Sequence, residues 1–324
     1  MKPMPMKAAV LTGLMFFATT AFAADGRASL HWSGQLDAAP SVPQAAVDYP
    51  EIPALSSQSV LVYDRVNGQP LLAKNATEQT PIASITKLMT AMLVLDAGQP
   101  LDEKITITHD DRDTLKGTGS RLAIGSSYTR GQLLHLALIA SDNRAAHALA
   151  RSHPGGLERF VANMNRMALA LGMRDTVYVE PTGLSSGNRS TAVDLALLAD
   201  YAYQNYPEIR EISTAGHYTL GTQRVVVRKK SRRQVEYRPV AFNNTNRFTR
   251  ADGWQVGLSK TGFINEAGHC LVMQANVAQR DVIIVLLDAR GKNGRAGDAT
   301  RIKGWLESAL PVSRADSRGA ASRT

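Results

Sequence analysis

The chain of 324 residues has little of what metal, redox or nucleotide chemistry requires. Its single cysteine, Cys270, excludes an internal disulfide and a cysteine-based metal site, and the apolar run around it is typical of a buried cysteine. The seven histidines are scattered without the spacing of metal ligands. No phosphate-binding glycine loop, internal repeat or heptad array occurs. The sequence therefore indicates no cofactor and no metal.

Long hydrophobic runs are also scarce. The run at the N-terminus has lysines at positions 2 and 7, an apolar stretch over 8–18 and the small-residue string Ala21-Phe-Ala23. This pattern predicts a signal peptide over residues 1–23, too short to span a membrane, and hence an exported protein. No later segment approaches the length of a transmembrane helix, and no cysteine follows the predicted cleavage site to carry a lipid.

The charge is unbalanced towards the basic side. The formal net charge is +9, and it becomes +7 without the two lysines of the predicted signal peptide. A basic surface suits an anionic polymer or a membrane surface, but simple solubility explains it equally well. The densest basic run spans 228–238. In an exported chain a solvated β-hairpin explains this run better than nucleic-acid binding, and contact with an anionic polymer or lipid stays open.

The hydrophobic pattern predicts strands, then helices, then strands. A hairpin is expected over 59–73, and helices dominate 129–205. Strands return after 216, and a last helical segment is expected over 300–310. We therefore predict one domain over 56–310 with an inserted helical lobe at about 98–205. The Pro/Ala-rich segment 24–55 is expected to be an extended arm and the polar segment 311–324 a mobile tail.

The string Ser84-Ile-Thr-Lys87 opens a segment, 85–95, that is apolar on nearly every side. This places Ser84 at the N-terminus of a buried helix, with Lys87 one turn later on the same face and able to take the hydroxyl proton. The alternative is an N-capping serine and a surface lysine. A lone lysine in a buried helix is costly without a role, and no other Ser-x-x-Lys occurs in the chain.

The string Ser141-Asp-Asn143 separates two apolar helical patterns, 132–140 and 144–150. A polar triplet there points into a cleft or towards water. In a cleft, the Ser141 hydroxyl would bridge two lysines and pass a proton to a leaving amine, while the Asn143 amide would hold the substrate backbone and Lys87. The alternative is a helix-capping loop.

The string Lys260-Thr-Gly262 lies in the first strand of a predicted hairpin, which a third strand follows. Gly262 would let a substrate backbone approach closely, and the Phe263 N–H would pair with that of the helix-start serine as an oxyanion hole. Lys260 would help to keep the first lysine neutral, and Thr261 would hold a substrate carboxylate. The alternative is a solvent-facing lysine on an edge strand. All three strings in this order indicate a serine acyl-transfer site.

The three strings are known together from class A β-lactamases and penicillin-binding proteins. Over about 55–310 the chain resembles the low-molecular-mass penicillin-binding proteins, the D-alanyl-D-alanine carboxypeptidases and endopeptidases of peptidoglycan. Supporting strings lie at 83–91, 180–184 and 190–195. The resemblance implies an α/β (α+β) fold of the β-lactamase/transpeptidase type, with an antiparallel sheet flanked by helices, an inserted all-helical lobe and the catalytic serine in the cleft between them.

The resemblance also implies the roles of individual residues. Ser84 is expected to be the nucleophile, Lys87 the general base, and Ser141 and Asn143 the relay and orienting groups. Lys260, Thr261, Gly262 and Phe263 would bind the substrate carboxylate and transition state. The implied partners are peptidoglycan cross-links and, as covalent inhibitors, β-lactams. A class A β-lactamase would carry a Glu-x-x-Leu-Asn string, which is absent here. We therefore expect a long-lived adduct with penicillin.

The resemblance favours the endopeptidase branch. Carboxypeptidase relatives commonly carry Ser-Gly-Asn, Lys-Thr-Gly-His, a further β-domain and an amphipathic anchor helix. This chain has Ser-Asp-Asn143 and Lys-Thr-Gly-Phe263 and ends soon after 310. We expect a periplasmic enzyme with at most peripheral membrane contact, which cleaves D-alanyl–diaminopimelate cross-links. A D-alanyl-D-alanine carboxypeptidase is the alternative.

Two other classes of function are weaker hypotheses. The string Gly183-Leu-Ser185-Ser-Gly187 matches the nucleophile elbow of an α/β-hydrolase, and Asp194, Asp252, His217 and His269 permit the required order along the chain. An elbow joins a strand directly to a helix, however, whereas residues 188–190 separate this one from the next helix, and the strand–helix alternation is missing. The other hypothesis is a non-catalytic peptidoglycan-binding protein, against which the intact three strings argue.

Overall fold

The computed structural model describes residues 51–229 and 232–308. The predicted signal peptide, nearly all of the predicted arm and the predicted tail therefore lie outside the described residues, as do most side chains of the basic run 228–238. Within the described part, no helix is long and apolar enough to cross a membrane.

A five-stranded antiparallel sheet forms the centre of the fold. Its strands are β1 (Ser57–Asp64), β2 (Gln69–Lys74), β9 (Gln255–Ile264), β10 (Gly268–Val277) and β11 (Arg280–Ala289), in the order β2-β1-β11-β10-β9. The residues of β11 from Val282 to Leu287 are completely buried, as expected for a central strand that is covered on both faces. This confirms the two predicted hairpins and the third strand, and it puts β9 at an edge.

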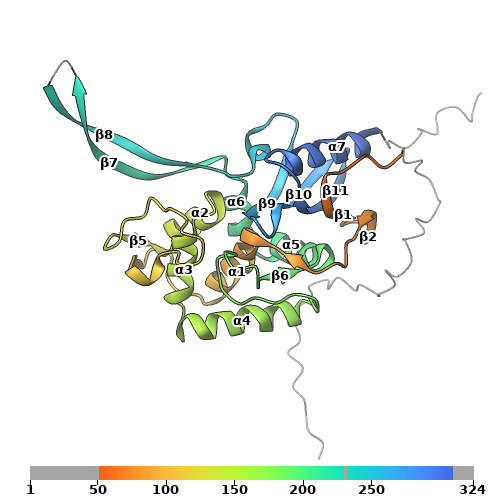
Figure 1. Cartoon of the computed structure of the whole chain (residues 1–324), viewed down its shortest axis with the longest axis horizontal. Coiled ribbons are helices and arrows are strands. Elements are labelled where there is room, and N and C mark those ends of the chain that lie inside the picture. Colours follow the sequence, from red (N-terminus) through yellow and green to blue (C-terminus); the bar gives the residue numbers. More distant parts are fainter. Residues whose placement is uncertain (1–50, 230–231, 309–324) are drawn as a thin grey trace, which may run out of the picture. The chain divides into compact units, whose positions relative to one another are not determined.

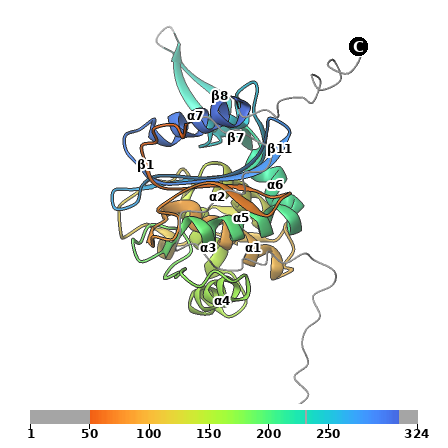
Figure 2. The same cartoon turned by 90° about the vertical axis from the view of Figure 1, so that its right-hand side faces the viewer.

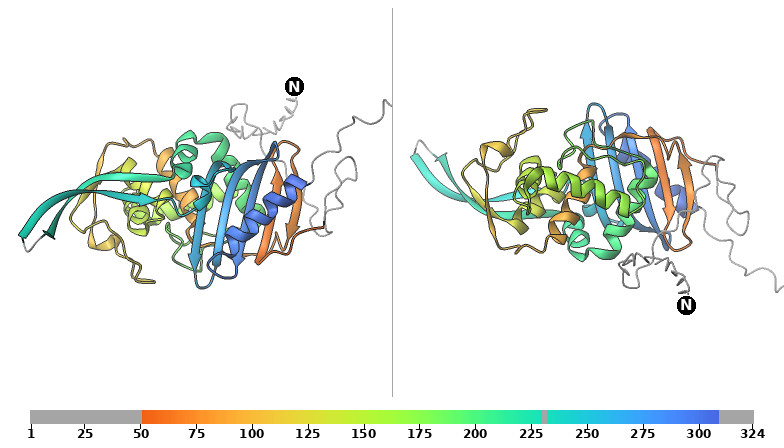
Figure 3. Two further views of the ribbon diagram at one scale, coloured as in Figure 1. Left: turned by 90° about the horizontal axis from the view of Figure 1, so that it is seen from above. Right: turned by 90° about the horizontal axis from the view of Figure 1, so that it is seen from below.

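Helices cover both faces of this sheet (Figure 2). On one face, α7 (Gly294–Ser308) lies across the strands, and Ile302, Trp305 and Leu306 pack against Val60, Met273 and other apolar residues of the sheet (Figure 3). On the other face, α5 (Ala192–Asn205) packs against β1, β10 and β11. Helix α7 begins six residues before the predicted segment, because Gly294 and Gly297 weaken the helical pattern in its first turn.

The remaining helices are α1 (Lys87–Asp96), α2 (Arg130–Ile139), α3 (Asn143–Arg151), α4 (Gly156–Ala170) and α6 (Pro207–Thr214). Side chains cap two of them: the Thr129 hydroxyl accepts from the Gln132 N–H at α2, and the Asp142 carboxylate accepts from the Ala145 N–H at α3. These ends lie where the sequence pattern placed the breaks between helices.

The predicted lobe over 98–205 is not entirely helical, which corrects the prediction. Strand β4 (Lys104–Thr106) pairs with β5 (Ser127–Thr129), and β3 (Thr80–Pro81) pairs with β6 (Arg189–Ser190). Strands of two or three residues are too short to show a period-two pattern, so the sequence gives no signal for them. Helix α5, which also falls in this range, packs on the sheet.

Strands β7 (His217–Lys229) and β8 (Arg232–Asn243) form a separate two-stranded ribbon (Figure 1). This confirms that strands return after 216 and that the basic run lies in a hairpin. Three short 3-10 helices complete the described fold: η1 (Ala83–Thr86), η2 (His109–Asp111) and η3 (Arg247–Arg250).

Candidate active site

Ser84 lies in η1, the tight turn that leads into α1, and this turn packs against β9. Ala83 has a left-handed backbone with φ of 47°, which is strained for a residue with a side chain. Gly183 contacts it so closely that an added Cβ would lie 1.9 Å from the Ala83 carbonyl oxygen. The segment around Gly183 therefore fixes the turn that carries Ser84.

Lys87 is completely buried, and its side chain points at Ser84. Its Nζ lies 2.7 Å from Ser84 Oγ, 2.7 Å from Asn143 Oδ1 and 2.5 Å from the Thr182 carbonyl oxygen. Burial lowers the pKa of Lys87 to about 8, and the negative charge of Glu180 acts in the opposite direction. A neutral amine has two N–H groups for the two carbonyl oxygens and one lone pair for the serine hydroxyl. The three contacts therefore fit a lysine that accepts the serine proton.

The loop after α4 supports this lysine. The Glu180 carboxylate accepts from the Thr182 N–H at 2.6 Å, the Gly183 N–H at 2.6 Å and the Asn188 side-chain amide at 3.0 Å. Asn188 also donates to the hydroxyl of Thr86, at 3.0 Å. Glu180 and Asn188 thus hold the loop in the shape that presents the Thr182 carbonyl to the lysine, a role that no sequence pattern predicted.

The second string meets both of its interpretations, because Asp142 caps α3 while Ser141 and Asn143 contact the two buried lysines. Ser141 has φ of 58°, and its hydroxyl accepts from Lys260 Nζ at 2.9 Å. Asn143 contacts Lys87 through its oxygen and donates to Thr118 Oγ1 at 2.9 Å through its nitrogen. Ser141 alone therefore does not bridge the two lysines as predicted. Ser141 contacts Lys260, and Asn143 contacts Lys87.

Lys260 is only 1% exposed, so the interpretation as a solvent-facing lysine is wrong. Its Nζ donates to Ser141 Oγ and, at 2.8 Å, to the carbonyl oxygen of Thr261. Burial lowers the pKa of Lys260 well below that of an ordinary lysine, and the positive charges of Lys87 and Arg295 lower it further. Its ammonium form therefore lacks an anionic partner among the described residues.

The rest of the third string lies against the turn that carries Ser84. An added Cβ on Gly262 would lie 3.0 Å from the Ser84 nitrogen, so β9 approaches the turn as closely as a glycine allows. Thr261 donates its hydroxyl to Thr245 Oγ1 at 2.6 Å. Phe263 is 52% exposed and stacks on His269, with ring centroids 4.4 Å apart. The oxyanion hole built from the Ser84 and Phe263 N–H groups stays a prediction.

Comparison with known proteins agrees with this geometry. Residues 45–291 match the model of peptidase family S11, D-alanyl-D-alanine carboxypeptidase. The chain belongs to this family. It is accordingly a serine-type hydrolase, which contradicts the hypothesis of a non-catalytic binding protein.

Relatives within the family are named either endopeptidases or carboxypeptidases. A D-alanyl-D-alanine endopeptidase of Pseudomonas aeruginosa is 46% identical over 78% of either chain. One of Escherichia coli is 39% identical over 88% of this chain and 91% of the relative. A D-alanyl-D-alanine carboxypeptidase of Bacillus subtilis is 30% identical over 77% of this chain and 61% of the relative.

Solved structures of similar proteins show the same fold. A variant of a DD-transpeptidase of Streptomyces superposes with a TM-score of 0.69, is 28% identical and covers 80% of this chain and 100% of its own. Penicillin-binding protein D2 of Listeria monocytogenes in its cefotaxime-bound form has a TM-score of 0.67 at 28% identity, over 79% and 99% of the two chains. The predicted fold class is thereby confirmed.

The nucleophile-elbow hypothesis is wrong for this member of the S11 family. The central sheet is antiparallel, whereas an α/β-hydrolase has a mostly parallel one. The Ser185 hydroxyl accepts from the Gly187 N–H, while the Asp194 carboxylate accepts from Thr176 in a buried network of its own.

In the described ranges, no group of three or more His, Cys, Asp or Glu residues has the arrangement of a metal site.

The structure adds one further cation to the site. Arg295, at the start of α7, donates to the carbonyl oxygens of Gly262 at 2.8 Å and Cys270 at 3.3 Å. It thus ties β9 to β10 beside the third string and contributes positive charge next to Lys260. Nothing in the sequence singled out Arg295, because it lies more than 30 residues from the string and sits in the glycine-weakened first turn of its helix.

Proposed function

We propose that this chain is a DD-endopeptidase that hydrolyses D-alanyl–diaminopimelate cross-links of peptidoglycan through an acyl-enzyme on Ser84. The observation that carries the proposal is the buried Lys87, whose amine contacts the Ser84 hydroxyl and has a pKa of about 8. A lysine with such a pKa is available as a base near neutral pH. The endopeptidase names of the two relatives with 46% and 39% identity support the choice of bond.

The geometry supports the following sequence of steps. Lys87 takes the proton of Ser84 as Oγ attacks the carbonyl carbon of D-alanine, and the Ser84 and Phe263 N–H groups stabilise the oxyanion. The amide C–N bond then breaks, and the leaving amine takes the proton of the Ser141 hydroxyl, which recovers one from the Lys260 ammonium that it contacts. Water then attacks the ester carbonyl. Its proton returns through Ser141 to Lys260, and the proton held by Lys87 goes back to Ser84 Oγ as the ester C–O bond breaks. The two lysines thus supply a base and a proton path to the leaving group.

The leaving side of the substrate would lie along β9. A free carboxylate next to the scissile bond would meet Lys260 and the Thr261 hydroxyl, and it would provide the anionic partner that the buried Lys260 lacks. Asn143, held by Lys87 and Thr118, would orient the backbone of the acyl side.

The bond specificity is tested with two substrates. Purified protein is incubated with cross-linked muropeptide dimers and with a monomeric pentapeptide, and the products are separated chromatographically. The proposal predicts conversion of dimers to monomers. Release of D-alanine from the pentapeptide with the dimers left intact would show a D-alanyl-D-alanine carboxypeptidase instead.

The proposal extends to inhibitors and location. The solved structures of the Listeria protein contain cefotaxime or ampicillin, which supports β-lactams as acylating inhibitors of Ser84 here. The adduct is expected to persist, so rapid turnover of nitrocefin would contradict this part. Residues 1–23, as a signal peptide, would direct the protein to the periplasm, with any membrane contact peripheral. Fractionation of cells that express the full chain tests this.

A further inference from the structure

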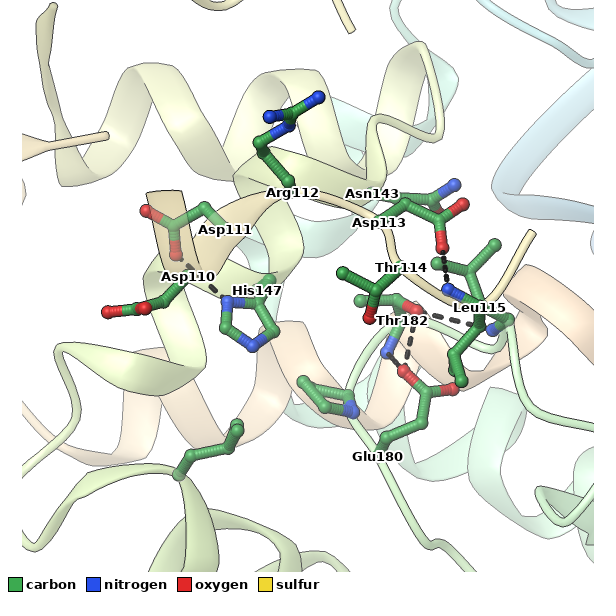
Figure 4. A pocket seen from close by; sticks show the side chains of 13 residues that line it. Asp110, Asp111, Arg112, Asp113, Thr114, Leu115, Asn143, His147, Glu180 and Thr182 are labelled. Carbon is green, nitrogen blue, oxygen red and sulfur yellow. Dashed lines mark hydrogen bonds and ion pairs between the residues drawn. The ribbon is translucent and has the colours of Figure 1, made fainter. Parts of the chain in front are cut away.

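A cavity of about 260 Å³ lies beside the site, between the segment 110–115, helix α3 and the loop 180–184 (Figure 4). We refer to it as the flanking cavity. Its apolar walls come from Leu115, Leu157, Pro181 and Leu184. None of the steps proposed for the reaction places a group of the substrate in this cavity.

The flanking cavity borders the proposed catalytic groups directly. Asn143 and Thr182 line it, and both contact Lys87 Nζ through an oxygen atom. None of its lining residues belongs to β9, the strand that carries Lys260 and Thr261. Since β9 is proposed to hold the leaving side of the substrate, the cavity lies on the acyl side of the scissile bond.

Most carboxylates in the wall of the cavity already have partners. Asp111 accepts from Arg151 and His147, each at 2.9 Å, and it is buried. Asp113 accepts from three backbone N–H groups of its own turn, and Glu180 accepts from those of the loop 180–185. The cavity is therefore an apolar slot with internally satisfied acids and not a pocket for a bare cation.

The polar groups that remain available stand around the slot. His147 is held by Asp111 through Nδ1, and Figure 4 shows the opposite edge of its ring turned away from that carboxylate. Asp110 and Arg112 flank Asp111 in the chain, are exposed and line the cavity, and the charge of Asp110 also acts on Arg151. One acid, one base and one imidazole thus lie around an apolar slot.

We propose that the flanking cavity is the subsite for the side chain of the diamino acid that precedes the scissile D-alanine. In a diaminopimelyl residue this side chain has three methylene groups and ends in an ammonium and a carboxylate. The methylenes would lie along Leu157 and Pro181, the ammonium would reach Asp110, and the carboxylate would reach Arg112 and His147. This inference rests on the proposed peptidase function but not on its endopeptidase preference, since pentapeptide and dimer carry the same residue at this position.

Filling the slot gives the first test. Leu157→Trp should lower kcat/KM on diaminopimelate-containing dimers, or on the pentapeptide if that is the substrate, by about tenfold or more. Acylation by 6-aminopenicillanic acid, which has no acyl side chain, should change less than about twofold. Leu169→Trp, on the same helix but 67% exposed and outside the cavity, is the matched control. Equal peptide cleavage by both variants would overturn the proposal.

Changing the rim charges gives the second test. Arg112→Gln should lower kcat/KM about tenfold on a stem peptide with diaminopimelate but leave a peptide with lysine at that position nearly unchanged, because lysine has no carboxylate for Arg112 to bind. Lys104→Gln, an exposed residue outside the cavity, is the control. A variant that loses activity on both peptides alike would contradict the assignment of Arg112. Failure of the parent protein to react even with 6-aminopenicillanic acid would instead refute the proposed function.

Discussion

Lys87 and Lys260 are both buried in one site, at 0% and 1% exposure, but their surroundings are opposite. Lys87 has three oxygen partners and the negative charges of Glu180 and Asp142 nearby. Lys260 has a hydroxyl and a carbonyl oxygen, and the charges that act on it are positive.

The difference shows how two buried lysines of one site can serve different purposes. Burial lowers the pKa of both, but nearby acids limit the decrease for Lys87, whereas cations increase it for Lys260. Lys87 therefore has a pKa that suits a base near neutral pH, while an anion that approaches Lys260 would stabilise its charged form. A substrate carboxylate at β9 would be such an anion, so the second lysine is suited to recognition.

Removing the serine that Lys87 contacts should have the largest effect. Ser84→Ala leaves no nucleophile beside Lys87, so we expect no covalent adduct with fluorescent penicillin in a gel assay. Ser185→Ala, in the neighbouring loop, should label like the parent protein. Labelling that persists in Ser84→Ala and disappears in Ser185→Ala would show that Ser185 is the nucleophile, and it would refute the proposed site.

Exchanging each lysine for arginine tests the comparison itself. Lys87→Arg keeps a positive charge but removes the proposed base, so acylation should fall by about 100- to 10,000-fold. Lys260→Arg keeps a cation that can meet a carboxylate, so the decrease should be about tenfold. Stopped-flow acylation by one β-lactam measures both, with circular dichroism to show that each variant is folded. Equal losses would mean that the two lysines do not have separate roles.

The pH dependence of acylation is expected to change the rate less than these substitutions do, but it tests the protonation state of Lys87 directly. Because Lys87 must be neutral to accept a proton, acylation should rise about tenfold per pH unit below the pKa and level off above it. With a pKa of about 8, the rise should lie below about pH 8 rather than near the value of about 10.4 for a free lysine. A profile that is flat from about pH 6 upwards would be incompatible with Lys87 as the base.

Much of the site was predictable because its chemistry is local in sequence. A serine and a lysine one helical turn apart, a polar break between two helices and a glycine in an edge strand each leave a signal within a few residues. The surroundings of Lys87 show the limit. One partner is the backbone oxygen of Thr182, which no side-chain pattern encodes, and Glu180 comes close enough to shape the loop and act on the lysine by its charge only once the chain is folded.

The fold shows the same division. The hairpin of β1 and β2 was predictable, since eight and six residues with a turn signal between them give a clear pattern. The pair β4–β5 was not, because three residues cannot show a period and residues 107–126 separate the two strands. Short pairings of this kind depend on the packing of helices on either side, which is a property of the whole fold.

The smallest effect, and the one that sharpens the comparison most, concerns the acid beside Lys87. Glu180→Gln removes a negative charge that raises the pKa of Lys87, so the rising limb of the pH profile should move to lower pH. Glutamine also brings an NH₂ group to a position that faces backbone N–H donors, and the loop should loosen.

We expect the acylation rate of Glu180→Gln at its plateau to fall by about tenfold, and the free energy of unfolding to fall by about 2 kcal/mol. Glu158→Gln, an exposed residue of α4, controls for the loss of a charge alone. A rate loss without movement of the pH limb would mean that Glu180 only shapes the loop. If the rising part of the pH profile moved to higher pH, the charge of Glu180 would not raise the pKa of Lys87. The difference between the surroundings of Lys87 and Lys260 would then not explain their different roles.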